Sequence, residues 1–216
     1  MIVCDRFHFI HIPKTGGKSV YAALSHFDQR RPKTWKGRIA RRLGIPLHWT
    51  EARLRRHDDL AAAHRYARGI DSFTFAVVRD PYDHAVSHYR HLQTQNKDRR
   101  FADRSLTSSL PDFLEWRAAG AGLRGGRNLR FAQLPNQFFF VQRDGKLAVD
   151  RLLRLETIDS DFQALCRDLD LGEIELPRVN VNSTANPVDL DARSIRIIND
   201  LYAEDFEAFG YPMRSA

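Results

Sequence analysis

The chain has 216 residues, 43% of them hydrophobic, and its 34 Lys and Arg against 27 Asp and Glu give a formal net charge of +7 at pH 7. This composition predicts one compact domain over residues 1–216 that buries about 70% of its unfolded surface, which removes the need for a second domain. The positive charge favours acidic partners: an anionic nucleotide, a polyanionic glycan, nucleic acid or an anionic membrane surface.

Cysteine count and hydropathy exclude other classes of protein. Cys4 and Cys166 are the only cysteines, which are too few for a disulfide framework or a zinc motif. The sequence does not exclude a single disulfide bond between them. No apolar run reaches the roughly 18 residues of a membrane span, and the first residues lack the apolar stretch and cleavage site of a signal peptide. We therefore expect a soluble protein of the reducing cytoplasm.

The first predicted unit is a strand, a glycine turn and a helix. Residues 7–12 form a short apolar strand, residues 13–19 read Pro-Lys-Thr-Gly-Gly-Lys-Ser, and a helix is expected from near Ser19. Two adjacent glycines let backbone N–H groups point at one oxyanion, the helix N-terminus adds partial charge, and Lys14 and Lys18 add full charges. The segment predicts a site for phosphate or sulfate.

The same turn has a second interpretation as a kinase-like nucleotide loop. Its last three residues, from Gly17 to Ser19, match the end of the Walker A pattern. That pattern needs a glycine five residues before Gly17, where this chain has Ile12. A kinase-like phosphotransferase would also require Mg²⁺ and an acid on a second strand, which the sequence does not offer.

A basic insertion, about residues 30–56, follows the first helix. Glu51 is its single acid, and Trp35 and Trp49 flank its middle, where they would stack on sugar faces or serve as core anchors. Two interpretations stay open, a solvated helical face or the lining of a site for an acidic acceptor. The basic residues are Arg30, Arg31, Lys33, Lys36, Arg38, Arg41, Arg42, Arg53, Arg55 and Arg56.

A second strand–turn–helix unit begins at residues 73–78, an apolar run rich in β-branched and aromatic residues. Pro81 suits a first helical turn and Asp80 its cap, so Arg79 falls at the carboxyl end of the strand and Ser87 about two turns down the helix. Ligands of open α/β sheets bind at these strand ends, where Arg offers a planar fork and Ser a hydroxyl to a phosphate.

The rest of the chain supplies further strands and helices. Residues 118–128 are glycine-rich and basic and predict a loop, either a functional lid or a tolerated insertion. Together the elements predict an α/β fold, a three-layer domain with a mostly parallel sheet flanked by helices. Strands are expected at 136–141, 147–150 and 152–156, and helices at 160–169 and at 192–209, the last closed by Gly210.

The two phosphate motifs together resemble those of sulfotransferases that use 3′-phosphoadenosine 5′-phosphosulfate (PAPS), most closely the carbohydrate and heparan-type branch. Residues 13–19 are similar to the 5′-phosphosulfate loop of that family, although relatives usually have Thr or Ala at Lys18. Arg79 followed by Ser87 is similar to its 3′-phosphate segment. The resemblance implies a P-loop-like fold, and without a membrane anchor it looks like a bacterial soluble form. Less specific likenesses lie at 136–137, 150–156, 180–182 and 202–206.

The resemblance implies transfer of a sulfuryl group from PAPS to an acceptor hydroxyl, expected on a carbohydrate or glycoconjugate, with 3′,5′-ADP as product and no metal. Lys14 would contact the leaving phosphate and the sulfuryl group. Arg79 and Ser87 would hold the 3′-phosphate. The 5′ end would be bound by Thr15, Gly16, Gly17, Lys18 and Ser19.

The resemblance implies a catalytic base between the two motifs, commonly a His or Glu in the family, and the chain has His48, His57 and His64 there. Residues 63–66 are similar to the Gly-His-x-x-Tyr/Phe stretch that carries the base in heparan-type relatives, which favours His64. His57 is the second candidate, because its distance along the chain to the second motif also fits. His11 would pack against or orient the loop.

Two further interpretations concern metal and polyanion binding. His84, His88 and His91 are spaced like one face of a helix, but no acid pattern accompanies them, so no metal site is predicted. A basic polyanion- or RNA-binding module without catalysis is the non-enzymatic alternative, and it predicts salt-dependent binding with no selectivity for a 3′-phosphate. For a sulfotransferase we expect neither a nucleic-acid partner nor a membrane span, and the sequence predicts no particular oligomeric state.

Overall fold

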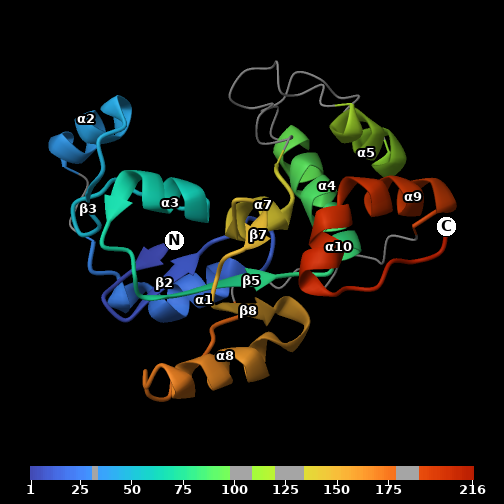
Figure 1. Ribbon diagram of the computed structural model, residues 1–216. Helices are drawn as coiled ribbons and strands as arrows, with labels where there is room; N and C mark the ends of the chain where they lie inside the picture. The colour runs from blue at the N-terminus through green and yellow to red at the C-terminus, as the bar shows by residue number, and fades with distance from the viewer. Residues whose placement is uncertain (31–33, 98–108, 120–133, 179–189) are drawn as a thin grey trace. The chain divides into compact units, whose positions relative to one another are not determined.

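A computed structural model of the chain describes residues 1–30, 34–97, 109–119, 134–178 and 190–216 (Figure 1). The chain divides into two compact units. One comprises Met1–Arg79 and Gln137–Asn182, and the other comprises Asp80–Asn136 and Ser183–Ala216. The expectation of a single domain over residues 1–216 stays a prediction.

The first unit is built on a four-stranded sheet with the order β1-β2-β5-β8. β1 is antiparallel to β2, whereas β2 with β5 and β5 with β8 are parallel, with Ile10 opposite Ala76 and Val78 opposite Arg154. The mostly parallel sheet is therefore confirmed, and β5 has the predicted bounds. The strands are β1 (Ile2–Val3), β2 (Phe7–Ile10), β5 (Phe73–Val78) and β8 (Arg151–Arg154).

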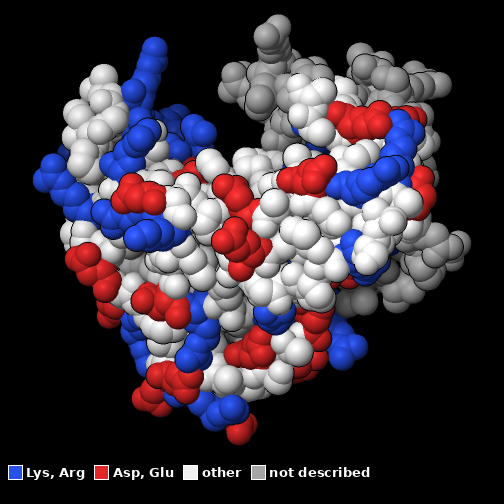
Figure 2. Space-filling model, turned by 45° about the vertical axis from the view of Figure 1, so that its right-hand side comes forward, with Lys and Arg blue, Asp and Glu red and all other residues white. Residues whose placement is uncertain are grey.

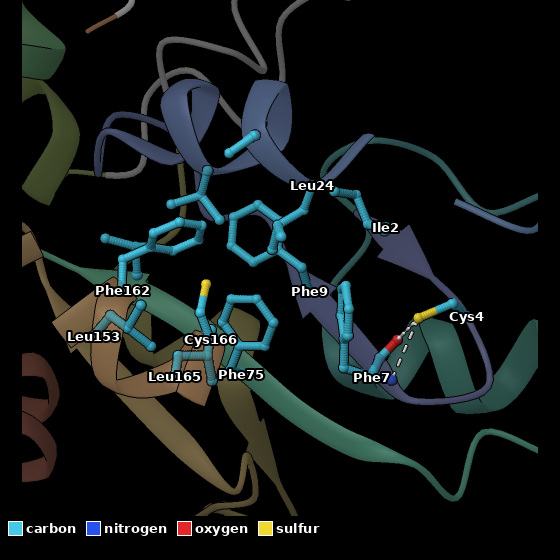
Figure 3. Close-up of a cluster of buried hydrophobic side chains, with 13 residues drawn as sticks. Ile2, Cys4, Phe7, Phe9, Leu24, Phe75, Leu153, Phe162, Leu165 and Cys166 are labelled. Atoms are coloured by element: carbon cyan, nitrogen blue, oxygen red, sulfur yellow. Dashed lines mark hydrogen bonds between the residues drawn. The ribbon is translucent and has the colours of Figure 1, made fainter. Parts of the chain in front are cut away.

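One face of this sheet packs against α1 (Gly17–Leu24) and α8 (Ile158–Asp168). Phe9 and Phe75 stack with ring centroids 5.1 Å apart, in a cluster drawn in Figure 3. Both cysteines, Cys4 and Cys166, are free thiols buried in this cluster, and burial raises the pKa of each. They act here as small core residues.

The other face of the sheet is buried as well. His8 and Thr74 are 2% and 6% exposed, and the His8 ring lies 6.3 Å from that of Trp49. Asp150 accepts hydrogen bonds from the Thr74 N–H at 2.6 Å and from its hydroxyl at 2.8 Å, which ties β5 to the start of β8. Strands buried on both faces are typical of parallel sheets in layered α/β proteins.

Beyond α1, the described residues of the connection between β2 and β5 form two further α-helices and a small parallel sheet. The 3-10 helix η1 (Ser25–Phe27) ends the first helical segment. The elements that follow are α2 (Trp35–Leu43), β3 (Leu47–His48), α3 (Leu60–Tyr66) and β4 (Ala67–Arg68), with β3 paired to β4.

The segment before β8 differs from the prediction. The expected strand at 136–141 is the helix α7 (Gln137–Val141), because Gln137, Phe140 and Val141 are buried at helical spacing and not in alternation. The strand expected at 147–150 is reduced to the two residues of β7 (Lys146–Leu147), paired with β6 (Gln142–Arg143) in a hairpin. A predicted strand at 152–156 is β8 followed by the 3-10 helix η4 (Leu155–Thr157).

The second unit is helical in its described residues: α4 (Pro81–Lys97), α5 (Leu110–Ala118), α9 (Ala192–Leu201) and α10 (Ala203–Phe209). Asp80 accepts the N–H groups of Tyr82 at 2.8 Å and Asp83 at 3.1 Å, so the predicted cap is confirmed. The single helix expected at 192–209 is interrupted at Tyr202, which has φ −112, while Gly210 closes it with φ 64 as predicted.

Several predictions fall wholly or partly outside the described residues. These are the glycine-rich loop from residue 120 onward, the segment 180–182, and Arg31 and Lys33 of the basic insertion. Within the described residues, no helix combines the length and the apolar character needed to cross a membrane.

Candidate functional site

The turn that follows β2 is tightly wound. Lys14 has φ 70 and Gly16 has φ 78, both in the left-handed region, which costs energy for any residue other than glycine. The Thr15 hydroxyl donates to the Ile12 carbonyl at 3.1 Å and closes the turn from within. Left-handed residues in such a turn direct successive N–H groups into one concavity, the form of an anion-binding nest.

Both glycines of the turn lie close to neighbouring side chains. A Cβ atom on Gly16 would lie 2.4 Å from Leu155 Cδ1, and one on Gly17 would lie 2.6 Å from His11 Cδ2. Gly17 is the first residue of α1, and the first N–H groups of a helix have no partner within it. The turn thus presents backbone donors at the positive end of a helix.

Two further cations lie within electrostatic range of Lys14 at this turn. The half-buried Lys14 interacts electrostatically with Lys18 and with Arg79, which follows β5 at the same edge of the sheet. Burial first, and then these two positive neighbours, lower the pKa of Lys14 to about 8. A bound anion would relieve this repulsion, so the electrostatics favour a phosphate or sulfate. The structure therefore brings the first motif and Arg79 together, as the sequence predicts.

Arg79 is held at this edge by Gln137. The Gln137 side-chain carbonyl accepts the Arg79 N–H at 2.9 Å, and its amide group donates to the Arg79 carbonyl at 2.8 Å. Gln137 itself is fully buried. Sequence reasoning noted this glutamine only as a likeness to relatives and missed its positioning role, which no local pattern signals.

His57 lies next to the loop. Its Nδ1 is 2.9 Å from the carbonyl oxygen of His11, and the two imidazole rings are 4.7 Å apart. Because a carbonyl only accepts, Nδ1 carries the hydrogen and Nε2 of the neutral ring keeps its lone pair. Desolvation lowers the pKa of His57 below its usual value, against the effect of this hydrogen bond, so the ring is neutral at pH 7.

His11 packs between His57 and the loop. Its ring is 3% exposed and stacks between Phe9, 5.6 Å away, and Tyr21, 6.2 Å away. Burial lowers the pKa of His11 to about 2, so the ring remains neutral, and its Nδ1 has no hydrogen-bond partner within the described residues. His11 therefore packs against the loop, as predicted.

His64 lies elsewhere on the first unit. It lines a cavity of about 640 Å³ between α3 and the β6–β7 hairpin, and burial followed by the charge of Arg143 lowers its pKa. Its other electrostatic neighbours are His8 in the first half of β2 and Asp71 just before β5, so it lies toward the amino ends of these strands. Of the two favoured histidines, the structure groups His57 with the loop.

The remaining candidate residues lie on other elements. Ser87 is partly exposed on α4, in the second unit. His48 is exposed, with its Nδ1 2.8 Å from the Thr50 hydroxyl. His84 and His88 are fully buried, edge-on to Tyr202 and Phe113 respectively. Within the described parts of the chain, no cluster of three or more His, Cys, Asp or Glu is arranged to hold a metal ion.

Comparison with known proteins gives one finding on the whole chain. A protein-family model described as the sulfotransferase family matches residues 2–212. No curated protein and no solved structure matches the chain. The matched range includes both phosphate motifs and every histidine between them.

Proposed function

The chain belongs to the sulfotransferase family, and from this premise we propose that it transfers the sulfuryl group of PAPS to a hydroxyl of a carbohydrate or glycoconjugate. Family membership establishes a transferase of sulfuryl groups. The donor and the acceptor are our proposal. The observation that carries it is that Lys18 and Arg79 both act electrostatically on Lys14, in a turn with left-handed residues at the carboxyl edge of the sheet.

The loop at residues 13–19 would bind the 5′-phosphosulfate through backbone N–H groups and its lysines. The Thr15 hydroxyl already donates to Ile12, so Thr15 would contribute its N–H. Arg79 would bind the 3′-phosphate with its planar fork, which separates PAPS from ATP. Ser87 remains the second proposed ligand of that phosphate, on the strength of the resemblance alone.

The chemistry needs a base and a stabilised leaving group. A histidine takes the proton of the acceptor hydroxyl, the hydroxyl oxygen forms a bond to sulfur, and the bond from sulfur to the bridging phosphate oxygen breaks. The electron pair of that bond leaves with 3′,5′-ADP, and protonated Lys14 would stabilise its charge. This scheme requires no metal.

His57 is the base that we favour. Its hydrogen bond to His11 leaves Nε2 as the proton acceptor, and its lowered pKa keeps the ring neutral at pH 7. His64 is the alternative from the resemblance, and its pKa is lowered as well. We favour His57 over His64 because of its position: His11, the hydrogen-bond partner of His57, also contacts Gly17 of the loop.

The experiment that tests this function is a transfer assay with PAPS carrying a labelled sulfuryl group. A panel of neutral and acidic oligosaccharides, a phenol and a small alcohol would serve as acceptors, with 3′,5′-ADP measured in parallel. We expect label on an oligosaccharide with equimolar 3′,5′-ADP and no effect of a chelator. Transfer from ATP–Mg²⁺ in place of PAPS would support the kinase-like alternative. Transfer only to the phenol would refute the carbohydrate acceptor while leaving the donor intact.

A further inference from the structure

Helix α2 presents its apolar side chains to solvent. Its buried face consists of the small residues Gly37 and Ala40, whereas helices of globular proteins normally turn large apolar residues inward. The large apolar side chains are exposed instead. Three of them are spaced by four residues along α2, namely Trp35 (63% exposed), Ile39 (50%) and Leu43 (66%), and Ile45 (49%) lies just beyond the helix. We call these four residues the apolar stripe.

The outward direction of the stripe is fixed by contacts on the opposite side of α2. Gly37 lies so close to the chain that a Cβ atom there would be 3.0 Å from the Glu51 carbonyl oxygen. Arg41 forms a two-pronged ion pair with the buried Asp58, at 2.6 and 2.8 Å, and its guanidinium lies 4.1 Å from the centre of the Tyr66 ring. The helix therefore cannot turn its stripe inward without breaking a buried ion pair.

A pocket of about 310 Å³ adjoins the same helix. Asp58 neutralises Arg41, and four further arginines make the pocket strongly positive. Figure 2 shows Lys and Arg side chains gathered at the upper left, on the part of the first unit that contains α2. The residues that line the pocket are Arg38, Arg41, Arg42, Arg53, Arg55 and Tyr66.

Apolar side chains beside arginines on one helix are the features of a helix that lies in a membrane interface. There the apolar side chains enter the boundary of the acyl chains, Trp prefers the headgroup level, and arginines bind lipid phosphates. We propose that α2, with its apolar stripe and the arginine pocket, binds the surface of an anionic phospholipid membrane. This inference is independent of the sulfuryl donor and acceptor.

Other occupants fit the two features less well. A second copy of the chain would bring two basic surfaces together, and like charges across an interface are repulsive. A nucleic acid or an acidic glycan would use the arginines but would leave the apolar stripe in water. Of these partners, an anionic membrane is the one whose chemistry matches both the stripe and the pocket.

The test is co-sedimentation of the full chain with vesicles. Vesicles of equal parts phosphatidylcholine and phosphatidylglycerol should bind the protein, and pure phosphatidylcholine should bind it at least tenfold more weakly. The triple variant Trp35→Ser, Ile39→Ser, Leu43→Ser and the triple variant Arg38→Ala, Arg42→Ala, Arg55→Ala should each lose about a hundredfold in affinity. All six side chains are exposed, so we expect both variants to fold.

Two controls separate this proposal from its competitors. The matched variant Leu147→Ser, Met213→Ser removes exposed apolar side chains elsewhere, 41% and 52% exposed, and should bind as the unmodified chain does. Anionic vesicles should shift the Trp fluorescence to the blue, and Trp35→Phe should abolish the shift while binding persists. Equal binding to both vesicle types, or none, would overturn the proposal. A dimer in solution that dissociates in the variant Trp35→Ser, Ile39→Ser, Leu43→Ser would also overturn the proposal, because the stripe would then be a self-association surface.

Discussion

Gln137 binds Arg79 through both backbone groups of the arginine, with the N–H donating at 2.9 Å and the carbonyl accepting at 2.8 Å. This buried amide fixes the point at which the Arg79 side chain leaves the end of β5. Because Gln137 does not itself reach the proposed ligand, its effect on binding passes through Arg79.

Gln137→Glu keeps an acceptor for the Arg79 N–H and removes the donor to its carbonyl. We expect the preference for 3′,5′-ADP over 5′-AMP to fall about tenfold, and stability to fall by about 1–3 kcal/mol because a buried carbonyl loses its partner. Binding of both nucleotides and urea unfolding would be measured together. A loss of stability with the nucleotide preference unchanged would assign Gln137 a structural role only.

The left-handed conformation of Lys14 should cost stability. At φ 70 a side chain is strained by about 1–2 kcal/mol, a cost that glycine does not bear. Lys14→Gly should therefore unfold at higher urea than Lys14→Ala, while both bind 3′,5′-ADP much more weakly than the unmodified chain. Equal stability of the two variants would show that the turn is not strained.

Binding should also depend on the protonation of Lys14. Its pKa of about 8 means that the charged form, which attracts the anion, is lost as the pH rises through that value. Affinity for 3′,5′-ADP should hence fall between about pH 7 and about pH 9, and the chain should take up a proton on binding near pH 8 because the anion raises the pKa. Calorimetry in two buffers of different ionisation enthalpy measures this uptake. Lys14→Arg, which stays charged, should abolish it.

His57→Asn tests the assignment of the base. The Asn amide can replace the hydrogen bond to the His11 carbonyl but has no counterpart of Nε2. We expect kcat to fall by about 10²–10⁴-fold with 3′,5′-ADP affinity unchanged, and His64→Asn to change kcat little. In the unmodified enzyme the acid limb of the pH profile should lie below 6.5, since the folded environment lowers the pKa of His57. The reverse ranking of the two variants would move the base to His64.

The sequence predicted best the structural features that depend on residues adjacent in the chain. The strand 73–78, its Arg79 end and the Asp80 cap were all correct, because β-branched runs, caps and Pro at a first helical turn are local effects. The loop after β2 was likewise recognisable from its glycines, whose need for space the contacts with Leu155 and His11 explain.

The sequence failed where distant segments decide the structure. The Phe-rich run at 137–141 is helical and buries Gln137 against Arg79, a contact across 58 positions of the chain. The choice between His64, which the similarity favours, and His57 stays a prediction, and only the fold places His57 beside His11. The sequence also did not predict that the apolar side chains of α2 face outward. Its amphipathic pattern does not show which face of the helix the Arg41–Asp58 ion pair holds inward.

The most direct test of the account is calorimetric titration of the chain with 3′,5′-ADP, 5′-AMP and ATP–Mg²⁺. It would be repeated on Arg79→Ala and on the matched control Arg167→Ala, an exposed arginine of α8. We predict tight binding of 3′,5′-ADP that weakens at least tenfold without the 3′-phosphate and in Arg79→Ala, with the control unchanged. Preference for ATP–Mg²⁺, or equal affinity for 3′,5′-ADP and 5′-AMP, would contradict a PAPS site built on the loop and Arg79.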